Sequence, residues 1–244
     1  MRILTFSNRN LKEMLRDKLN LAFGLGFPLI VLLLLTVIGK NVPGGMFKTD
    51  DITPGISIFG LSFITLFSGM VISKDRASSF MTRLFASPMT SADFILGYTL
   101  PLVPIALGQT AICYLAALLL GLTPTVNILL SIIVSLPASI LYIALGLLCG
   151  SVLNDKQVGG LCGALLTNLT AWFSGTWFDI SLLGAQLKKL AHSLPFVHAV
   201  DACKAALNGQ YDEILPHLLW VLGYAAIMLT IAIIVFKRKM NSEK

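Results

Sequence analysis

The residues that could do chemistry gather in one polar segment, residues 179–217. It holds all 3 histidines of the chain together with several carboxylates: His192, His198 and His217, with Asp179, Asp201, Asp212 and Glu213. A metal site needs such groups to converge, but the separation of His192 from His198 does not place two ligands on one helical face. No serine is paired with a histidine base either. The pattern therefore favours interfacial polar side chains over a metal centre, and the chain is not expected to be an enzyme.

Nucleotide chemistry is also not expected of this chain. The sequence has no Gly-x4-Gly-Lys-Ser/Thr, which is the glycine-rich loop that holds nucleotide phosphates. The chain is therefore expected to bind no cofactor of its own, and any ATP-driven work would need a separate protein.

Six long apolar runs supply the elements that position these residues. They are Leu21–Gly39, Thr53–Ser73, Phe94–Leu120, Ile128–Ser151, Val158–Phe178 and Leu218–Phe236. Each is close to or above the roughly 20 residues that a helix needs to cross about 30 Å of hydrocarbon, and none contains Asp, Glu, Lys or Arg. We expect an all-α membrane protein with six transmembrane helices, folded as a single domain over residues 1–244. Proton-driven carriers keep ionisable residues inside the membrane, so the uncharged runs argue against that class.

The basic residues indicate the orientation. If the N-terminus is inside, thirteen of the 18 Lys and Arg residues lie in the termini and loops on the inner side, and five lie in loops on the outer side. Because Lys and Arg are enriched in cytoplasmic loops, both termini are predicted to be cytoplasmic, in the plasma (inner) membrane. The formal net charge of +6 then reflects topology, and nucleic acid is not an expected partner.

Three shorter segments have patterns of their own. In residues 1–20, Leu11, Met14 and Leu15 have the spacing of one helical face among basic residues, which predicts an amphipathic helix at the membrane interface. Residues 179–217 are predicted to form two short helices that re-enter the outer leaflet, separated by Pro195. Residues 74–90 are predicted to contain a short cytoplasmic helix that ends before Pro88. Its bulky apolar residues either bind a partner protein or anchor the loop to the membrane surface.

Two of these segments resemble motifs of the permease subunits of type-2 ABC exporters, in their drug-exporter-like branch. After the second span that family reads Glu-Arg-Glu-x-Gly-Thr-Leu-Glu-x-Leu-Leu-x-x-Pro, and five residues here match its two ends: Asp75, Arg76, Leu84, Phe85 and Pro88. Phe94–Gly97 matches the entry to the third span, whereas Ala77 and Thr82 replace acidic residues of the motif. Residues 194–209 resemble the family's outer segment, with a proline, then a helix with an acidic and a basic residue, then a glycine.

The resemblance implies the roles of several residues. The loop helix would be the coupling helix that docks on a cytoplasmic ABC ATPase, which would carry the ATP and magnesium. The docking residues would be Asp75, Arg76, Phe80, Arg83, Leu84, Phe85 and Pro88, and the outer re-entrant segment would use Pro195, His198, Asp201 and Lys204. Two permeases, as a homodimer or with a paralogue, would form the pathway among membrane lipids.

The cargo and its pathway are the least constrained features. The apolar spans favour a lipophilic or amphipathic cargo, such as a drug, an antimicrobial peptide or a lipid-like molecule. Candidates for the pathway or the dimer interface are Phe59, Phe63, Phe67, Asn168 and Trp172, although the four-residue spacing of the three phenylalanines also suits plain packing. Export of a lipid-linked glycan, a channel, and a membrane anchor or sensor that recruits a cytoplasmic partner remain alternatives.

Overall fold

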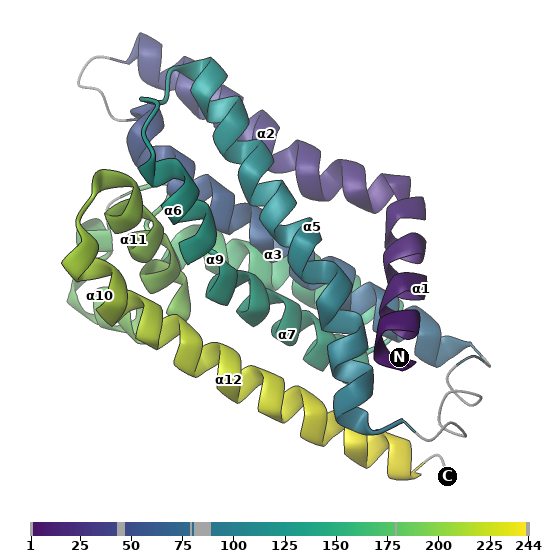
Figure 1. Ribbon diagram of the computed structural model, residues 1–244. Helices are drawn as coiled ribbons and strands as arrows, with labels where there is room; N and C mark the ends of the chain where they lie inside the picture. The colour runs from purple at the N-terminus through teal and green to yellow at the C-terminus, as the bar shows by residue number, and fades with distance from the viewer. Residues whose placement is uncertain (1, 43–46, 79, 81–88, 179, 243–244) are drawn as a thin grey trace.

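The computed structural model describes residues 2–42, 47–78, 80, 89–178 and 180–242, and every regular element in these ranges is helical (Figure 1). In chain order the helices are α1 (Arg2–Arg16), α2 (Lys18–Asn41), α3 (Thr49–Ala77), α5 (Ser91–Leu120), α6 (Asn127–Val134), α7 (Leu136–Val152), α8 (Asp155–Val158), the π-helix η1 (Gly159–Leu166), α9 (Thr167–Phe173), the 3-10 helix η2 (Ile180–Leu183), α10 (Gly184–Ser193), α11 (Pro195–Asn208) and α12 (Tyr211–Ser242).

Five of the expected spans coincide with stretches long and apolar enough to cross a membrane. They are Leu21–Asn41, Thr49–Ala77, Ser91–Leu120, Asn127–Val152 and Tyr211–Lys239. The all-α membrane architecture is thereby confirmed. The fourth of these stretches comprises α6 and α7, which meet at Ser135, two residues before Pro137, and proline lacks the backbone donor of a regular helix.

The expected fifth span, Val158–Phe178, is helical without a gap up to Phe173 but is not a single long α-helix, and a sixth span is not confirmed. The chain there forms α8, then η1, then α9, which ends at Phe173. The π-helix contains Gly159, Gly160 and Gly163, and glycine lowers the stability of a regular α-helix. Wider π turns are one way in which a helix accommodates such a local defect.

Helix α3 forms the centre of the bundle. Its apolar stretch is 78% buried, whereas that of α12 is 17% buried. Helix α3 packs against α7, α5 and α2, and its side chains Ile58, Leu61 and Ile64 join Tyr98 of α5 and Tyr142 of α7 in the main apolar core. A helix that is apolar on all sides belongs in such an interior position.

Glycine allows α3 and α7 to approach closely. A Cβ atom added at Gly146 would lie 1.8 Å from Ser68 Oγ and 2.1 Å from the Thr65 carbonyl oxygen, and one at Gly150 would lie 2.3 Å from the Gly69 carbonyl oxygen. In contrast, a Cβ atom at Gly163 would lie 3.4 Å from the nearest atom, in a leucine side chain. Small residues four apart commonly mediate such helix contacts in membranes.

The substitution Gly146→Ala is therefore expected to destabilise the protein by about 1–3 kcal/mol, the usual cost of overpacking a tight core. Thermal unfolding in detergent, followed by intrinsic fluorescence, measures this loss. Gly163→Ala is the matched control and should be neutral or slightly stabilising, because alanine has the higher helix propensity. Equal unfolding temperatures for the two variants would contradict the close α3–α7 crossing.

The two ends of the bundle differ in what they carry. Both termini lie at one end, together with α1 and the junctions after α3 and α7, and α10 and α11 lie at the other end (Figure 1). At that second end α11 begins at Pro195 and ends at Asn208, and it is capped by Gly209, whose φ of 74° is a conformation that glycine adopts without steric cost. We call these the terminal end and the distal end.

Candidate functional site

A polar cluster at the terminal end joins α1, α3 and α5. The Arg9 guanidinium donates two hydrogen bonds to the Asp75 carboxylate, from Nη1 to Oδ2 at 2.8 Å and from Nη2 to Oδ1 at 3.0 Å. The Tyr98 hydroxyl donates to Asp75 Oδ2 at 2.6 Å. Asp75 is only 3% exposed, so its charge depends on these donors. Fork-to-fork pairing of this kind is among the strong hydrogen-bonded arrangements in proteins. We call Arg9, Asp75 and Tyr98 the terminal cluster.

Helix α1 is seated on α5 beside this cluster. Asn10 is fully buried and donates from Nδ2 to the Gly97 carbonyl oxygen at 3.1 Å. A Cβ atom at Gly97 would lie 2.4 Å from Phe6 Cδ1, so glycine is needed for this approach. The Phe6 ring also packs edge-on against Tyr98 at 5.0 Å between centroids. The buried face of α1 is thus Phe6, Asn10 and Met14.

This buried face includes a polar residue that the predicted apolar face does not contain. The sequence pattern assigns Leu11, Met14 and Leu15 to a single apolar face, but Leu15 is 53% exposed while the polar Asn10 is buried. Asn10 can replace a leucine inside because its amide bonds both the Arg9 guanidinium, at 3.0 Å, and the backbone of α5. A buried amide with satisfied partners carries little penalty.

Phe80 connects the terminal cluster to the loop that follows α3. The Arg9 Cζ atom lies 4.0 Å from the centroid of the Phe80 ring, and Phe80 stacks on Phe6 with 6.4 Å between centroids. Burial is the largest single influence and lowers the pKa of Arg9, but the hydrogen bond and charge of Asp75 together with the charges of Glu13 and Tyr98 raise the pKa overall. Arg9 therefore stays charged and serves both as the partner of Asp75 and as the cation over Phe80.

The end of α3 is also tied to α7 and α8. Arg76 Nη1 donates to the carbonyl oxygens of Gly150, at 2.8 Å, and Leu153, at 3.2 Å, which satisfies carbonyl groups at the end of α7. The Ser73 hydroxyl donates to the Asp155 carboxylate at the start of α8. Four neighbouring elements, α1, α5, α7 and α8, are thus linked to the C-terminal end of α3.

The predicted docking residues divide into two groups. Asp75 is buried and Arg76 is half-buried, and both make the internal contacts above, while Phe80 is half-buried against α1. Arg83, Leu84, Phe85 and Pro88 fall in 81–88, outside the residues that the structure describes. The sequence interpretation missed Arg9, Asn10 and Tyr98. The polar residues on the face of α1 were the only available signal, because Arg9 and Asp75 are 66 positions apart.

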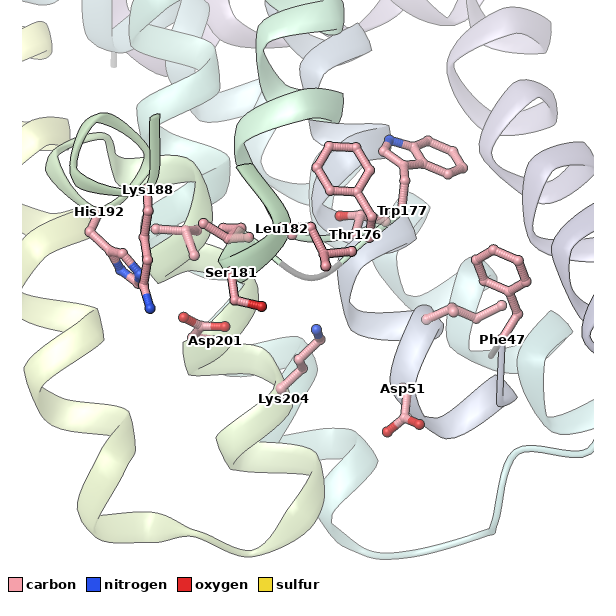
Figure 2. Close-up of a pocket in the computed structure, with 15 residues that line it drawn as sticks. Phe47, Asp51, Thr176, Trp177, Ser181, Leu182, Lys188, His192, Asp201 and Lys204 are labelled. Atoms are coloured by element: carbon pink, nitrogen blue, oxygen red, sulfur yellow. The ribbon is translucent and has the colours of Figure 1, made fainter. Parts of the chain in front are cut away.

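At the distal end the structure contains a cavity of about 630 Å³ (Figure 2). Its lining comes from the start of α3, residues 175–182, α10 and α11: Phe47, Asp51, Ile52, Gly175, Thr176, Trp177, Phe178, Ile180, Ser181, Leu182, Lys188, His192, Val197, Asp201 and Lys204. We call it the distal pocket. Two of the predicted outer residues, Asp201 and Lys204, therefore line one cavity.

The other two predicted outer residues hold α11 in place. Pro195 begins α11 and is buried. His198 Nε2 donates to the His192 carbonyl oxygen at 2.9 Å, so a neutral His198 accepts at Nδ1 from His217 Nδ1, 2.8 Å away on α12. The His198 ring stacks on Trp220 at 5.2 Å and 5° between planes. These contacts fasten α11 to α12 rather than forming a catalytic pair.

The predicted pathway residues do not converge. Phe59 and Phe67 are buried inside the fold and Phe63 is half-buried, with Phe59 and Phe63 in an edge-on contact at 5.8 Å. Asn168 and Trp172 lie instead on the exposed surface of α9. Within the described ranges, no three His, Cys, Asp or Glu side chains form a group that could hold a metal ion.

Comparison with known families gives one match. The family model described as ABC-2 type transporter matches residues 1–207, which includes α1, the terminal cluster and nearly all of α11. A comparison with curated proteins finds no match.

Proposed function

Since the chain belongs to the ABC-2 type transporter family, we propose that it is the permease subunit of an exporter driven by a separate cytoplasmic ATPase. The chain is a multi-pass membrane protein, an ABC transporter permease by family. The observation that carries the finer proposal is the terminal cluster. A force applied to the loop after α3 would be delivered at once to α1, α5 and α7, because Asp75, Arg76 and Phe80 connect these elements.

The energy would come from ATP and magnesium held by the partner ATPase. Docking on residues 81–88, through Arg83, Leu84, Phe85 and Pro88, would place the motor directly beyond Phe80. Closure of two ATPases would then tilt α3 and α5 and switch the bundle between two arrangements, as transitions at docking elements do. The basic residues near both termini, at the same end of the bundle (Figure 1), support a cytoplasmic location for this end in the plasma membrane.

A second permease, identical or paralogous, would complete the pathway. The segment from α8 to α9 presents Asn168 and Trp172 on its exposed surface, and a Cβ atom added at Gly159 or Gly160 would meet nothing within 4 Å. A polar amide and bare glycine backbone facing hydrocarbon are more typical of a helix contact than of a lipid surface. This face supports a partner copy there.

The cargo would be lipophilic or amphipathic and would move outward. Apolar residues dominate the exposed sides of α2 and α12, and walls of this kind suit drug-like, peptide or lipid-like molecules better than ions. The experiment reconstitutes the permease in liposomes with and without its ATPase and follows ATP-dependent movement of a lipophilic fluorescent dye. We expect movement only with the ATPase and ATP. Transport by the permease alone would overturn the proposal.

A further inference from the structure

Two opposite charges of α11, Asp201 and Lys204, line the distal pocket. Asp201 and Lys204 are both half-buried, and neither forms an ion pair with another residue in the described part of the chain. They lie one helical turn apart on α11, so both side chains project from the same face. Figure 2 shows them rising toward Ser181 on the opposite wall, with the carboxylate and the ammonium on different sides of that hydroxyl.

An unpaired, partly buried charge is costly in a folded protein. Burial raises the pKa of the Asp201 carboxyl, against the opposing charges of His217, Lys204, His198 and His192. Among the described residues, the surrounding positive charges do not outweigh the effect of burial on this carboxyl. A cationic group entering the pocket would stabilise the carboxylate further.

Most of the other lining residues are apolar or aromatic, and the polar ones are Asp51, Thr176, Ser181, Lys188 and His192. Phe47, Trp177 and Phe178 line the pocket together with Ile52 and Val197, and aromatic walls with a few charged groups are typical of small-ligand sites. A volume of about 630 Å³ is in the usual range of about 300–1,000 Å³ for such sites. The pocket can thus hold one charged head and part of an apolar chain.

From this arrangement we infer that the distal pocket binds a zwitterionic amphiphile, with its primary ammonium on Asp201, its anionic group on Lys204 and its apolar chain along Phe47, Trp177 and Phe178. A purely anionic amphiphile would leave Asp201 unpaired, and a purely cationic one would leave Lys204 unpaired. A small zwitterion without a chain would not use the aromatic wall. The inference goes beyond the proposed function, because it concerns a site away from the ATPase-docking end and needs no ATP.

The test uses the full-length permease, without an ATPase, in nanodiscs of phosphatidylglycerol. The probe is a lysophosphatidylethanolamine with a photoreactive diazirine in its acyl chain, and labelled peptides are identified by mass spectrometry. We expect labelling of the peptides around Phe47 and residues 175–182. Asp201→Asn and Lys204→Gln should each weaken half-maximal labelling about 10- to 100-fold, the usual effect of losing a charged hydrogen bond.

Lys189→Gln is the matched control, because Lys189 is exposed on α10 beside Lys188 but does not line the pocket; it should label like the wild type. A lysophosphatidylglycerol with the same chain should label at least about tenfold more weakly, since it lacks the ammonium. Wild-type labelling of both Asp201→Asn and Lys204→Gln, or equal labelling by the two probes, would overturn the inference.

A competition experiment distinguishes a bilayer lipid from a detached amphiphile as the ligand of the distal pocket. If diacyl phosphatidylethanolamine added to the nanodiscs displaces the probe, the pocket takes the head group of a bilayer lipid. If only the single-chain amphiphile displaces it, the pocket takes a detached molecule such as a cargo. ATP-driven dye export is measured separately on the same variants, so failure of the pocket and failure of the proposed function give different results.

Discussion

Arg9→Met is expected to lower the free energy of unfolding by about 2–3 kcal/mol, because it leaves the buried Asp75 carboxylate with the Tyr98 hydroxyl as its remaining side-chain donor. Breaking a buried ion pair costs up to about 3–5 kcal/mol. We expect a loss below this range because the Arg9 side chain is 36% exposed, so water can partly solvate Asp75 once the arginine is gone. For a chain of this length the loss corresponds to roughly 4–12 °C in Tm, measured by fluorescence during heating in detergent.

Glu13→Gln provides the matched control on the same arginine. Glu13 also pairs with Arg9, at 2.7 Å, but its side chain is 46% exposed, and an exposed pair four residues apart in a helix contributes only about 0.3–0.5 kcal/mol. The double variant Arg9→Met/Asp75→Asn should recover part of the loss, because no buried charge then remains. If the double variant is as unstable as the sum of the two single variants, the pair is not coupled as the structure indicates.

The long spans could be predicted from sequence because a run of uncharged residues has few alternatives in a bilayer. The type of helix within a span could not be predicted in the same way. The run 158–178 is as apolar as its neighbours, but within it the helix changes from the π form of η1, which contains three glycines, to the α form of α9. Hydropathy does not register such a change, since glycine and alanine both suit a membrane helix.

The terminal cluster is a second feature that could not be predicted from the sequence. Asp75 and Arg76 were interpreted as docking residues because they occupy the start of a family motif, yet in the structure both turn toward the rest of the bundle. Their partners are Arg9 and the ends of α7, which no local pattern connects to them. Long-range pairing depends on how α1 lies over α5, and this in turn depends on Gly97 admitting Phe6.

The distal pocket could be predicted in part, unlike the terminal cluster. Asp201 and Lys204 belong to one predicted helix, and their spacing alone places them on one face. On the opposite wall Phe47 comes from a segment far away in sequence, and Trp177 lies 24 positions before Asp201, outside the predicted outer segment. Sequence could therefore identify the charged half of the site, and only the fold could supply the apolar half.

In the assembled transporter, Leu84→Asp is expected to weaken ATPase binding at least about 30-fold, corresponding to about 2 kcal/mol or more for an apolar anchor at a protein interface. Cargo-stimulated ATP turnover should be lost, whereas the basal turnover of the free ATPase stays unchanged. Co-purification and turnover measurements on the complex test both expectations. Lys237→Asp is the control, because it places the same charge at an exposed position near the C-terminal end of α12 and should leave binding unchanged.

Phe80→Asp distinguishes the docking of the ATPase from the transmission of its movement into the permease. The Phe80 ring packs on Phe6 and beneath Arg9, so its loss should disturb the permease itself, while the loss of Leu84 should disturb only the contact with the motor. We therefore expect Phe80→Asp to reduce both the Tm of the isolated permease and coupled turnover, and Leu84→Asp to reduce turnover alone. If neither variant changes cargo-stimulated turnover, residues 80–88 do not receive the motor, and the force must enter the bundle elsewhere. If Leu84→Asp lowers the Tm as much as Phe80→Asp does, this loop packs within the permease along its whole length and is not a free docking surface.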